Sequence, residues 1–265
     1  METCLICGTS FGSPKEHLKT IRYILDPITH PWLDETDPEL ARLDGISRYL
    51  GLCLSCLAQL PFLDVTPVNE PIYTSWTSPL LMEKEKSVNI IGPVSALEYL
   101  ELGREVITRV KFSRENRLRR LWKFLGLMAL EQSWNLDPPN LRIGGIIPVP
   151  GSGFGHWQRG FQPVTWLAKD LANCLNIPMI DLFSHRGNQS QKLLTRSQRL
   201  SNQSSIAVKS NLKHPHRNKL EQLIKGKEVI LVDDVVTTGS TLLHASSLLE
   251  QWNPGAIRII TLVKD

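Results

Sequence analysis

The chain has 265 residues, of which 42% are hydrophobic, a length that suits one sizeable core and a small accessory module. The formal net charge of +4 is modest, so the positions of the basic residues matter more than their number. No segment approaches the roughly 18 uninterrupted apolar residues of a membrane span, and no apolar stretch follows a basic N-terminal region. These features argue against a membrane protein and a signal peptide, and we expect a protein that stays in the cytoplasm.

Four of the five cysteines form two Cys-x-x-Cys pairs, Cys4 with Cys7 and Cys53 with Cys56. This spacing lets both thiolates of a pair reach one tetrahedral ion, which predicts a structural zinc site with these four ligands. A redox-active dithiol and free thiols are the alternatives, whereas disulfides are not expected in a reducing cytosol.

The residues between the two cysteine pairs, about 11–52, contain several Asp and Pro residues and predict an inserted excursion. It lies within a zinc module that we expect to span residues 1–60. The insertion contains His17 and His30, for which an exposed loop position is expected rather than a role as replacement zinc ligands.

Residues 61–96 are interrupted by prolines, among them Pro61, Pro67, Pro71 and Pro79, which predicts a linker or a set of short strands. Val88 to Ile91 has the composition of one such strand, and we expect Gly92 and Pro93 to end it.

Glu101 to Trp134 has helical periodicity of its apolar residues, which predicts two consecutive helices that part near Ser113. The outer faces are basic, and Glu105 and Glu115 are the only acids between residues 104 and 123. The basic residues of that interval are Arg104, Arg109, Lys111, Arg114, Arg117, Arg119, Arg120 and Lys123. A solvated helix face and a surface for an anionic partner explain this run equally well.

Gly144 to Val149 predicts a buried strand, followed by the Gly-rich loop from Gly151 to Gly155 and then a helix. The apolar face of the helix is expected to contain Trp166, Leu167, Leu171 and Leu175. Cys174 is expected on the same face as a small core residue.

Residues 182–220 contain no acid, although basic residues are spread through them. The basic residues are Arg186, Lys192, Arg196, Arg199, Lys209, Lys213, Arg217 and Lys219. Such a segment suits either a flexible cationic hood over a site or a surface for nucleic acid.

The stretch from Val229 to Thr241, VILVDDVVTTGST, concentrates the chemistry of the chain. Its apolar start predicts a strand buried in a parallel sheet, and the residues after it predict a helix with one apolar face. That face contains Leu242, Ala245, Leu248, Leu249 and Trp252. The loop between strand and helix would lie at the carboxyl edge of the sheet, where backbone N–H groups and the glycine favour a phosphate.

The acids Asp233 and Asp234 would repel a phosphate unless they face its sugar hydroxyls or a Mg²⁺ ion. A phosphorylated sugar satisfies both the acids and the loop. A structural turn capped by Asp or Thr is the alternative, but it leaves the second acid and the run of small residues unexplained.

This stretch resembles the phosphoribosyl pyrophosphate (PRPP) motif of type I phosphoribosyltransferases, in which an apolar strand, two acids and a Thr-Gly loop bind ribose 5-phosphate. The C-terminal two-thirds of the chain resembles the ComF family of competence-associated, phosphoribosyltransferase-like proteins. The resemblance implies that Mg²⁺–PRPP binds here, with Asp233 and Asp234 at the ribose hydroxyls. It implies a PRPP site composed of Asp233, Asp234, Val235, Val236, Thr237, Thr238, Gly239, Ser240 and Thr241.

Other segments are similar to the same family, whose members carry an N-terminal four-cysteine zinc site and a Lys-Phe pair, here Lys111-Phe112. Gln158 to Gln162 resembles the family's Arg-Gly-Phe-Asn-Gln segment, with Gln162 and Pro163 in place of its Asn and Gln. Gln191 to Arg199 resembles its Gln-x-x-Leu-x-Arg-x-x-Arg segment. The resemblance implies that pyrophosphate is held by Arg159, Gly160, Arg196 and Arg199.

We therefore expect a type I phosphoribosyltransferase fold over residues 97–265, with a central, mostly parallel sheet flanked by helices. The acceptor, the catalytic residues and the occurrence of transfer are left open, and the sequence is compatible with an oligomer. In hypoxanthine-guanine phosphoribosyltransferases an Asp that acts as the base stands where this chain has Thr237, which disfavours purine salvage.

The alternative function is a non-catalytic module in which PRPP or a nucleotide regulates the handling of single-stranded DNA during natural transformation, together with competence proteins. Trp122 and Trp157 are candidates for stacking on bases, although the apolar neighbours of Trp122 favour a core position for it.

Overall fold

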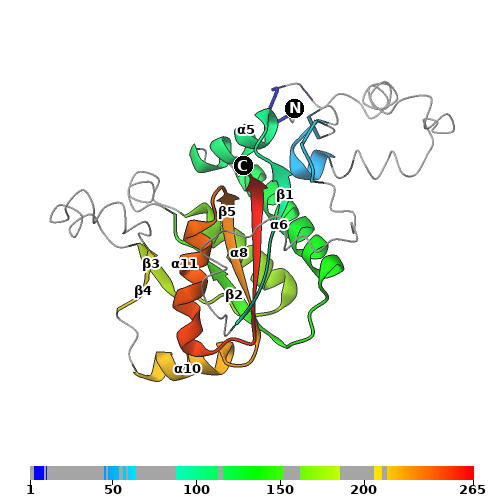
Figure 1. Ribbon diagram of the computed structural model, residues 1–265. Coiled ribbons are helices and arrows are strands. Elements are labelled where there is room, and N and C mark those ends of the chain that lie inside the picture. The colour runs from blue at the N-terminus through cyan, green and yellow to red at the C-terminus, as the bar shows by residue number, and fades with distance from the viewer. Residues whose placement is uncertain are drawn as a thin grey trace, which may run out of the picture. The chain divides into compact units, whose positions relative to one another are not determined.

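The computed structural model (Figure 1) describes residues 3–8, 10, 45, 47–53, 56–57, 59–63, 88–112, 116–151, 162–185, 206–210 and 214–265. The chain forms two compact units. The cysteine unit comprises Met1–Phe62 and Leu97–Phe124, and the sheet unit comprises Leu63–Ala96 and Leu125–Asp265. The first two predicted helices thus contribute residues to the cysteine unit, and only the second helix continues into the sheet unit.

The sheet unit is built on a four-stranded sheet with the strand order β1-β6-β5-β2. These strands are β1 (Asn89–Glu98), β2 (Ile143–Pro148), β5 (Glu228–Val236) and β6 (Ala256–Lys264). Strands β2 and β6 both pair in parallel with β5. Their carboxyl ends therefore lie at one edge of the sheet, which confirms the predicted α/β architecture with a central parallel sheet.

The two units also contain helices and a second, two-stranded sheet. The helices are α5 (Glu101–Phe112), α6 (Asn116–Leu136), α8 (Pro163–Leu175), α10 (His214–Ile224) and α11 (Ser240–Leu249), and the 3-10 helix η3 spans Glu250–Trp252. Strands β3 (Phe183–His185) and β4 (Ile206–Val208) pair antiparallel. Two helices between 101 and 136 and a helix after the Thr-Gly loop are as predicted, and none of the described helices is long and apolar enough to cross a membrane.

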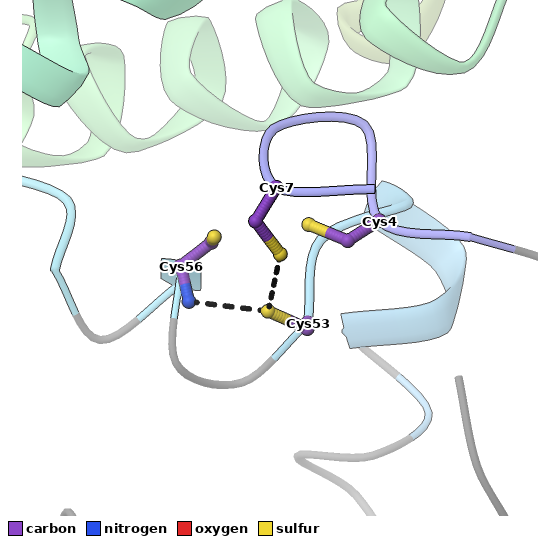
Figure 2. Close-up of side chains that lie close together, drawn as sticks. All are labelled: Cys4, Cys7, Cys53 and Cys56. Carbon is purple, nitrogen blue, oxygen red and sulfur yellow. Dashed lines mark hydrogen bonds between the residues drawn. The ribbon is translucent and has the colours of Figure 1, made fainter. Parts of the chain in front are cut away.

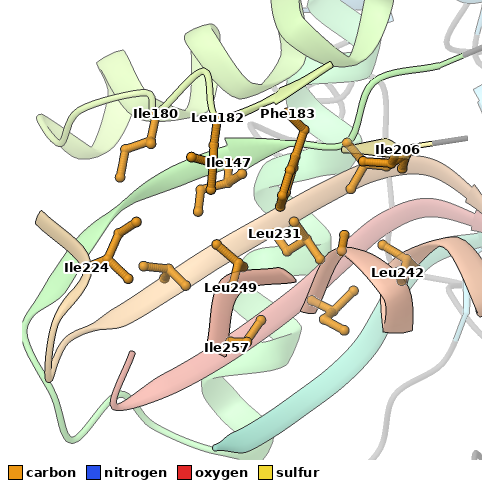
Figure 3. Close-up of a cluster of buried hydrophobic side chains, with 14 of the residues drawn as sticks. Ile147, Ile180, Leu182, Phe183, Ile206, Ile224, Leu231, Leu242, Leu249 and Ile257 are labelled. Carbon is orange, nitrogen blue, oxygen red and sulfur yellow. The ribbon is translucent and has the colours of Figure 1, made fainter. Parts of the chain in front are cut away.

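Strand β5 is buried on both faces over its first five residues because apolar side chains point to both sides of it. On one face, Leu231 belongs to a cluster with Leu242 and Leu249 of α11 (Figure 3). Ile180, Leu182 and Phe183, which follow α8 in the chain, join the same cluster. Of the apolar face predicted for α11, Leu248 is only partly buried and the other members are buried.

Strand β1 corrects one prediction, because it does not end at Gly92 and Pro93 but continues through them to Glu98. Gly92 has φ +93°, and a Cβ on it would lie 2.5 Å from the carbonyl oxygen of Ile259 on β6. The close approach of β6 requires glycine here, and β1 is an edge strand, where a proline is tolerated.

Helix α8 corrects a second prediction. Its buried face contains Leu167, Ala168, Leu171 and Ala172, whereas Cys174 is exposed. Cys174 lies in the last turn of the helix, where Leu171 and Ala172 form the packed surface, so the thiol is not a core residue.

Candidate functional site

The four predicted zinc ligands lie together in the cysteine unit. Their sulfur atoms lie within 4.8 Å of one another, and Figure 2 shows the four side chains converging from two loops. The Sγ atoms of Cys7 and Cys53 are 3.7 Å apart. A tetrahedral ion with Zn–S bonds of about 2.3 Å separates its sulfur ligands by about 3.8 Å, so the cluster fits zinc.

Both cysteine loops turn tightly around the cluster. Gly8 has φ +73° and donates its N–H to the carbonyl of Cys4 at 3.0 Å, which closes the first loop. In the second, the N–H of Cys56 points to the Sγ of Cys53 at 3.4 Å, an interaction that stabilises a negatively charged sulfur. The N–H of Leu5 bonds the carbonyl of Gly51 at 2.8 Å and joins the two loops.

Burial raises the pKa of the Cys56 thiol, and it raises the pKa of the Cys53 thiol as well. Three of the four cysteines, Cys4, Cys53 and Cys56, are buried, so thiolates here without a cation would be unfavourable because they are poorly solvated and repel one another. Binding of a divalent metal therefore has to displace the thiol protons, as is usual for structural zinc sites.

Arg109 of α5 supports the first cysteine loop from the side. Its guanidinium donates to the carbonyl oxygens of Leu5 and Ile6, the two residues between Cys4 and Cys7. It also pairs with Glu105 one turn earlier on α5, at 2.7 Å. The sequence left Arg109 on a basic helix face that suited either solvent or an anionic partner, and the structure shows its guanidinium bonded to the loop between Cys4 and Cys7.

The predicted phosphate site lies where β5 passes into α11. Gly239 precedes the helix with φ 66°, the left-handed conformation for which glycine is suited. The first N–H groups of an α-helix have no partner within the helix, so the start of α11 presents donors to the carboxyl edge of the sheet. Thr237 and Thr238 are exposed beside it, and Ser240 and Thr241 are half-buried.

Asp233 and Asp234 lie on β5 itself and not in the loop that follows it, because β5 runs to Val236. Both are half-buried, and Asp233 pairs in register with Thr261 of β6. Strand β2 ends beside Val232, so the two acids lie past the end of β2 at the edge where the helix begins. Both acids therefore lie on β5 between the end of β2 and the Thr-Gly loop.

The predicted pyrophosphate contacts Arg159, Gly160, Arg196 and Arg199 lie outside the described residues, as does Trp157. Trp122 is 2% exposed, so it is a core residue, as its apolar neighbours indicated, and is not available for stacking. The described parts of the basic segment 182–220 form β3, β4 and α10. His244 of α11 lies 3.2 Å from the carbonyl oxygen of Ile206 and links the phosphate-site helix to β4.

Sequence reasoning missed a buried ion pair in the sheet. Arg258 of β6 and Glu228 of β5 are 0% and 1% exposed and 2.6 Å apart. The guanidinium also donates to the hydroxyl and carbonyl of Ser133 and to the carbonyl of Asp137, both at the C-terminal end of α6. Glu228 is the first residue of β5 and Arg258 the third residue of β6, and no local pattern indicates that the two strands pair in this register.

Comparison with known proteins gives the family. A family model of the phosphoribosyl transferase domain matches residues 159–265. Competence protein F of Haemophilus influenzae is 31% identical over 232 residues, covering 81% of this chain and 90% of that protein. DNA utilization protein YhgH of Escherichia coli K12 is 27% identical over 177 residues, covering 64% and 71%. Competence protein ComFC of Bacillus subtilis is 25% identical over 171 residues, covering 64% and 63%. The chain, with its parallel sheet, Thr-Gly loop and four-cysteine cluster, belongs to the ComF family of phosphoribosyltransferase-like proteins.

Proposed function

We propose that the chain binds Mg²⁺–PRPP at the carboxyl edge of its sheet and serves in DNA uptake during natural transformation. The observation that carries the ligand is the order of groups along β5 and α11. Two acids fixed by the sheet come first, followed by a glycine in the left-handed conformation and a helix start. The names of the relatives, competence protein F and DNA utilization protein, support the biological process.

Charge placement sets the orientation of PRPP in this proposal. The helix start and the hydroxyls of Thr237 to Thr241 receive the 5-phosphate, since backbone donors and the helix dipole favour an anion. Asp233 and Asp234 accept hydrogen bonds from the ribose hydroxyls, because a carboxylate cannot approach the phosphates directly. Mg²⁺, when bound with the ligand, supplies the positive charge that the pyrophosphate needs, and carboxylate oxygens suit it.

Calorimetric titration with Mg²⁺–PRPP tests the site. Replacing Asp233 and Asp234 by Asn removes the charge-assisted hydrogen bonds and should weaken binding by roughly 1.5–3 kcal/mol for each bond lost. Asp181→Asn is the control, because this carboxylate is 57% exposed and pairs with Lys209 beside β3 and β4 rather than at the edge beyond β5. Unchanged PRPP affinity in the double variant would refute the assignment.

Whether ribosyl transfer follows binding is decided by measuring pyrophosphate release from PRPP with a panel of bases and of single-stranded nucleic acids. Release that depends on one acceptor would make the chain an enzyme. PRPP binding without release under any acceptor would make PRPP a regulatory ligand, and the chain a non-catalytic module for handling DNA.

A second function, binding of single-stranded nucleic acid, is favoured by the charge of α5 and α6. Among the described side chains of these helices in the cysteine unit, Arg104, Arg109, Arg119, Arg120 and Lys123 are basic and only Glu105 is acidic. Fluorescence anisotropy with a labelled oligonucleotide tests it. Binding that falls steeply as salt rises is expected, and no binding at low salt would exclude it.

A further inference from the structure

Tyr49 presents an aromatic ring at the surface of the cysteine unit. The residue is 50% exposed and is one of three large hydrophobic residues that are exposed in the described part of the chain, with Phe62 and Leu100. The guanidinium carbon of Arg120 lies over its ring, 5.2 Å from the centroid. This is a cation–π geometry, and it combines a flat apolar surface with a positive charge.

Tyr49 lies in the short segment that leads into the second cysteine pair. Residues 47–50 form a helical turn, and two hydrogen bonds close its end. The N–H of Gly51 donates to the carbonyl of Arg48 at 3.2 Å, and the N–H of Leu52 donates to the carbonyl of Ser47 at 3.0 Å. Leu50 and Leu52 on either side are fully buried. The next residue is Cys53, so the metal ligand fixes the chain four positions after the ring.

Arg120 is held from the other side by the packing of α6. Leu118, Leu121 and Trp122 of the same helix are at most 2% exposed, so they anchor this part of α6 in the core of the unit. Arg120 lies on the opposite, exposed face. Tyr49 and Arg120 therefore meet on a surface whose two sides are each tied to a packed part of the cysteine unit.

The surroundings favour a polyanion as the partner. The helical stretch 101–124, which includes Arg120, has eight basic residues against three acids, Glu101, Glu105 and Glu115. Arg109 and Glu105 pair with each other, and without this pair the basic residues still outnumber the acids. A ring and a guanidinium that are stacked on each other can receive an unpaired base, whereas the bases of a duplex are already stacked inside it.

We propose that Tyr49 and Arg120 form a stacking site for a base of single-stranded DNA, and that the four-cysteine metal site holds this site in place. The proposal rests on the nucleic-acid part of the proposed function and names its location. In this proposal zinc has a structural role in DNA binding, because it fixes the loop that carries Tyr49. It also replaces Trp122 as the aromatic contact, because Trp122 is buried.

The test uses the full zinc-loaded chain and fluorescence anisotropy with a labelled oligodeoxythymidine and a matching abasic oligonucleotide, which has the phosphates but not the bases. Tyr49→Leu should weaken binding of the oligodeoxythymidine about tenfold, because stacking on one base is lost. Tyr49→Phe should stay within about twofold, since the ring is kept. On the abasic oligonucleotide Tyr49→Leu should bind like the unaltered chain.

Arg120→Gln has a matched control in Lys225→Gln, which removes one positive charge from a side chain that is 63% exposed in the sheet unit. Arg120→Gln should lose more affinity for thymidine than Lys225→Gln does. Zinc content is measured in every sample. If Tyr49→Leu loses zinc, the comparison of Arg120→Gln with Lys225→Gln tests the proposal instead. Equal losses of affinity for oligodeoxythymidine in those two variants would overturn it.

Two further outcomes overturn the proposal and separate it from the proposed function. Unchanged affinity of Tyr49→Leu, or an equal loss on thymidine and abasic DNA, removes the stacking site but leaves nucleic-acid binding in place. Absence of binding by the unaltered chain at low salt removes both the stacking site and the nucleic-acid function. PRPP titration of Tyr49→Leu is independent of these results and should give the affinity of the unaltered chain.

Discussion

The two compact units are stabilised by different physical means. The sheet unit buries strands β5 and β6 between apolar side chains on both faces, and its candidate ligand site is formed by the ends of these strands. The N-terminal loops of the cysteine unit have few buried apolar residues in the described part, mainly Leu5, Leu50, Leu52 and Leu60, and converge on four thiols. A packed parallel sheet keeps its site without a metal, whereas short loops of this kind depend on one. The two units should therefore respond separately to metal removal and to changes in the core.

The largest expected effect is that of removing the metal. Structural zinc contributes about 10–16 kcal/mol in zinc-finger peptides, far more than the few buried leucines of these loops can supply. Chelation, or Cys53→Ser, should therefore disorder the N-terminal loops, which hydrogen exchange detects as loss of protection at Leu5 and Leu52. PRPP binding should persist, because that site belongs to the sheet unit.

Zinc analysis sharpens this prediction. About one zinc ion per chain is expected after reconstitution under reducing conditions, and Cys53→Ser should lose it. Cys174→Ser is the control, because Cys174 is exposed on α8 and lies outside the cluster. Full zinc retention in Cys53→Ser would show that the ligands are wrongly assigned.

The next effect in size is confined to the sheet unit. Glu228→Gln leaves the guanidinium of Arg258 buried without its counter-charge, which costs about 3–5 kcal/mol of unfolding free energy. Glu221→Gln is the matched control, because Glu221 is 52% exposed and its pair with Lys225 spans 3.6 Å, and it should cost less than about 1 kcal/mol. Urea denaturation of both variants measures the difference. Equal losses would mean that the ion pair does not stabilise the sheet.

The metal site and the buried ion pair also show which features of the molecule could be predicted from the sequence. The cysteine cluster and the phosphate edge could be predicted because their residue types recur at short, fixed spacings, Cys-x-x-Cys and Asp-Asp-x-x-Thr-Thr-Gly. The pair of Glu228 and Arg258, 30 residues apart, depends on the register of β5 against β6, which no local pattern specifies. The bonds of Arg109 could not be predicted for the same reason, since its carbonyl partners lie 104 and 103 residues away in the sequence.

Strand ends were harder to predict than strands. The composition of Val229 to Val232 indicated a buried strand, but β5 continues through two acids to Val236, since β6 remains paired with it as far as Lys264. A charged side chain usually marks the end of a buried strand. Here it marks the point where β2 has ended and one side of β5 faces the candidate ligand site.

A smaller effect is expected when Gly239 is replaced, and a matched glycine variant distinguishes loss of phosphate binding from general backbone strain. Gly239→Val and Gly226→Val both place a β-branched residue at nearly the same positive φ, 66° and 65°, so each should lose roughly 1–3 kcal/mol of stability. Gly226 lies just before β5 and Gly239 just after it, at opposite ends of the strand. Only Gly239→Val should also lose binding of ribose 5-phosphate, measured by calorimetry. Loss of binding in both variants would assign the effect to strain and not to the phosphate site.

The smallest effect is expected at Arg109. It tests whether the bonds from α5 to the loop between Cys4 and Cys7 contribute to zinc affinity. Arg109→Gln removes the bonds to the carbonyls of Leu5 and Ile6, and since the side chain is 43% exposed, solvent screens much of the lost interaction. Residues that orient metal ligands typically contribute about tenfold or more to affinity, so a loss of up to about tenfold in zinc affinity is expected. Arg104→Gln removes the same charge from the same helix and is the control. Competition with a chromophoric chelator measures both, and equal zinc affinities in the two variants would show that the bonds of Arg109 to the loop do not contribute to zinc binding. A loss in Arg109→Gln alone would show that the position of the loop between Cys4 and Cys7 is set by α5, and that the metal site and the basic helix form one functional element.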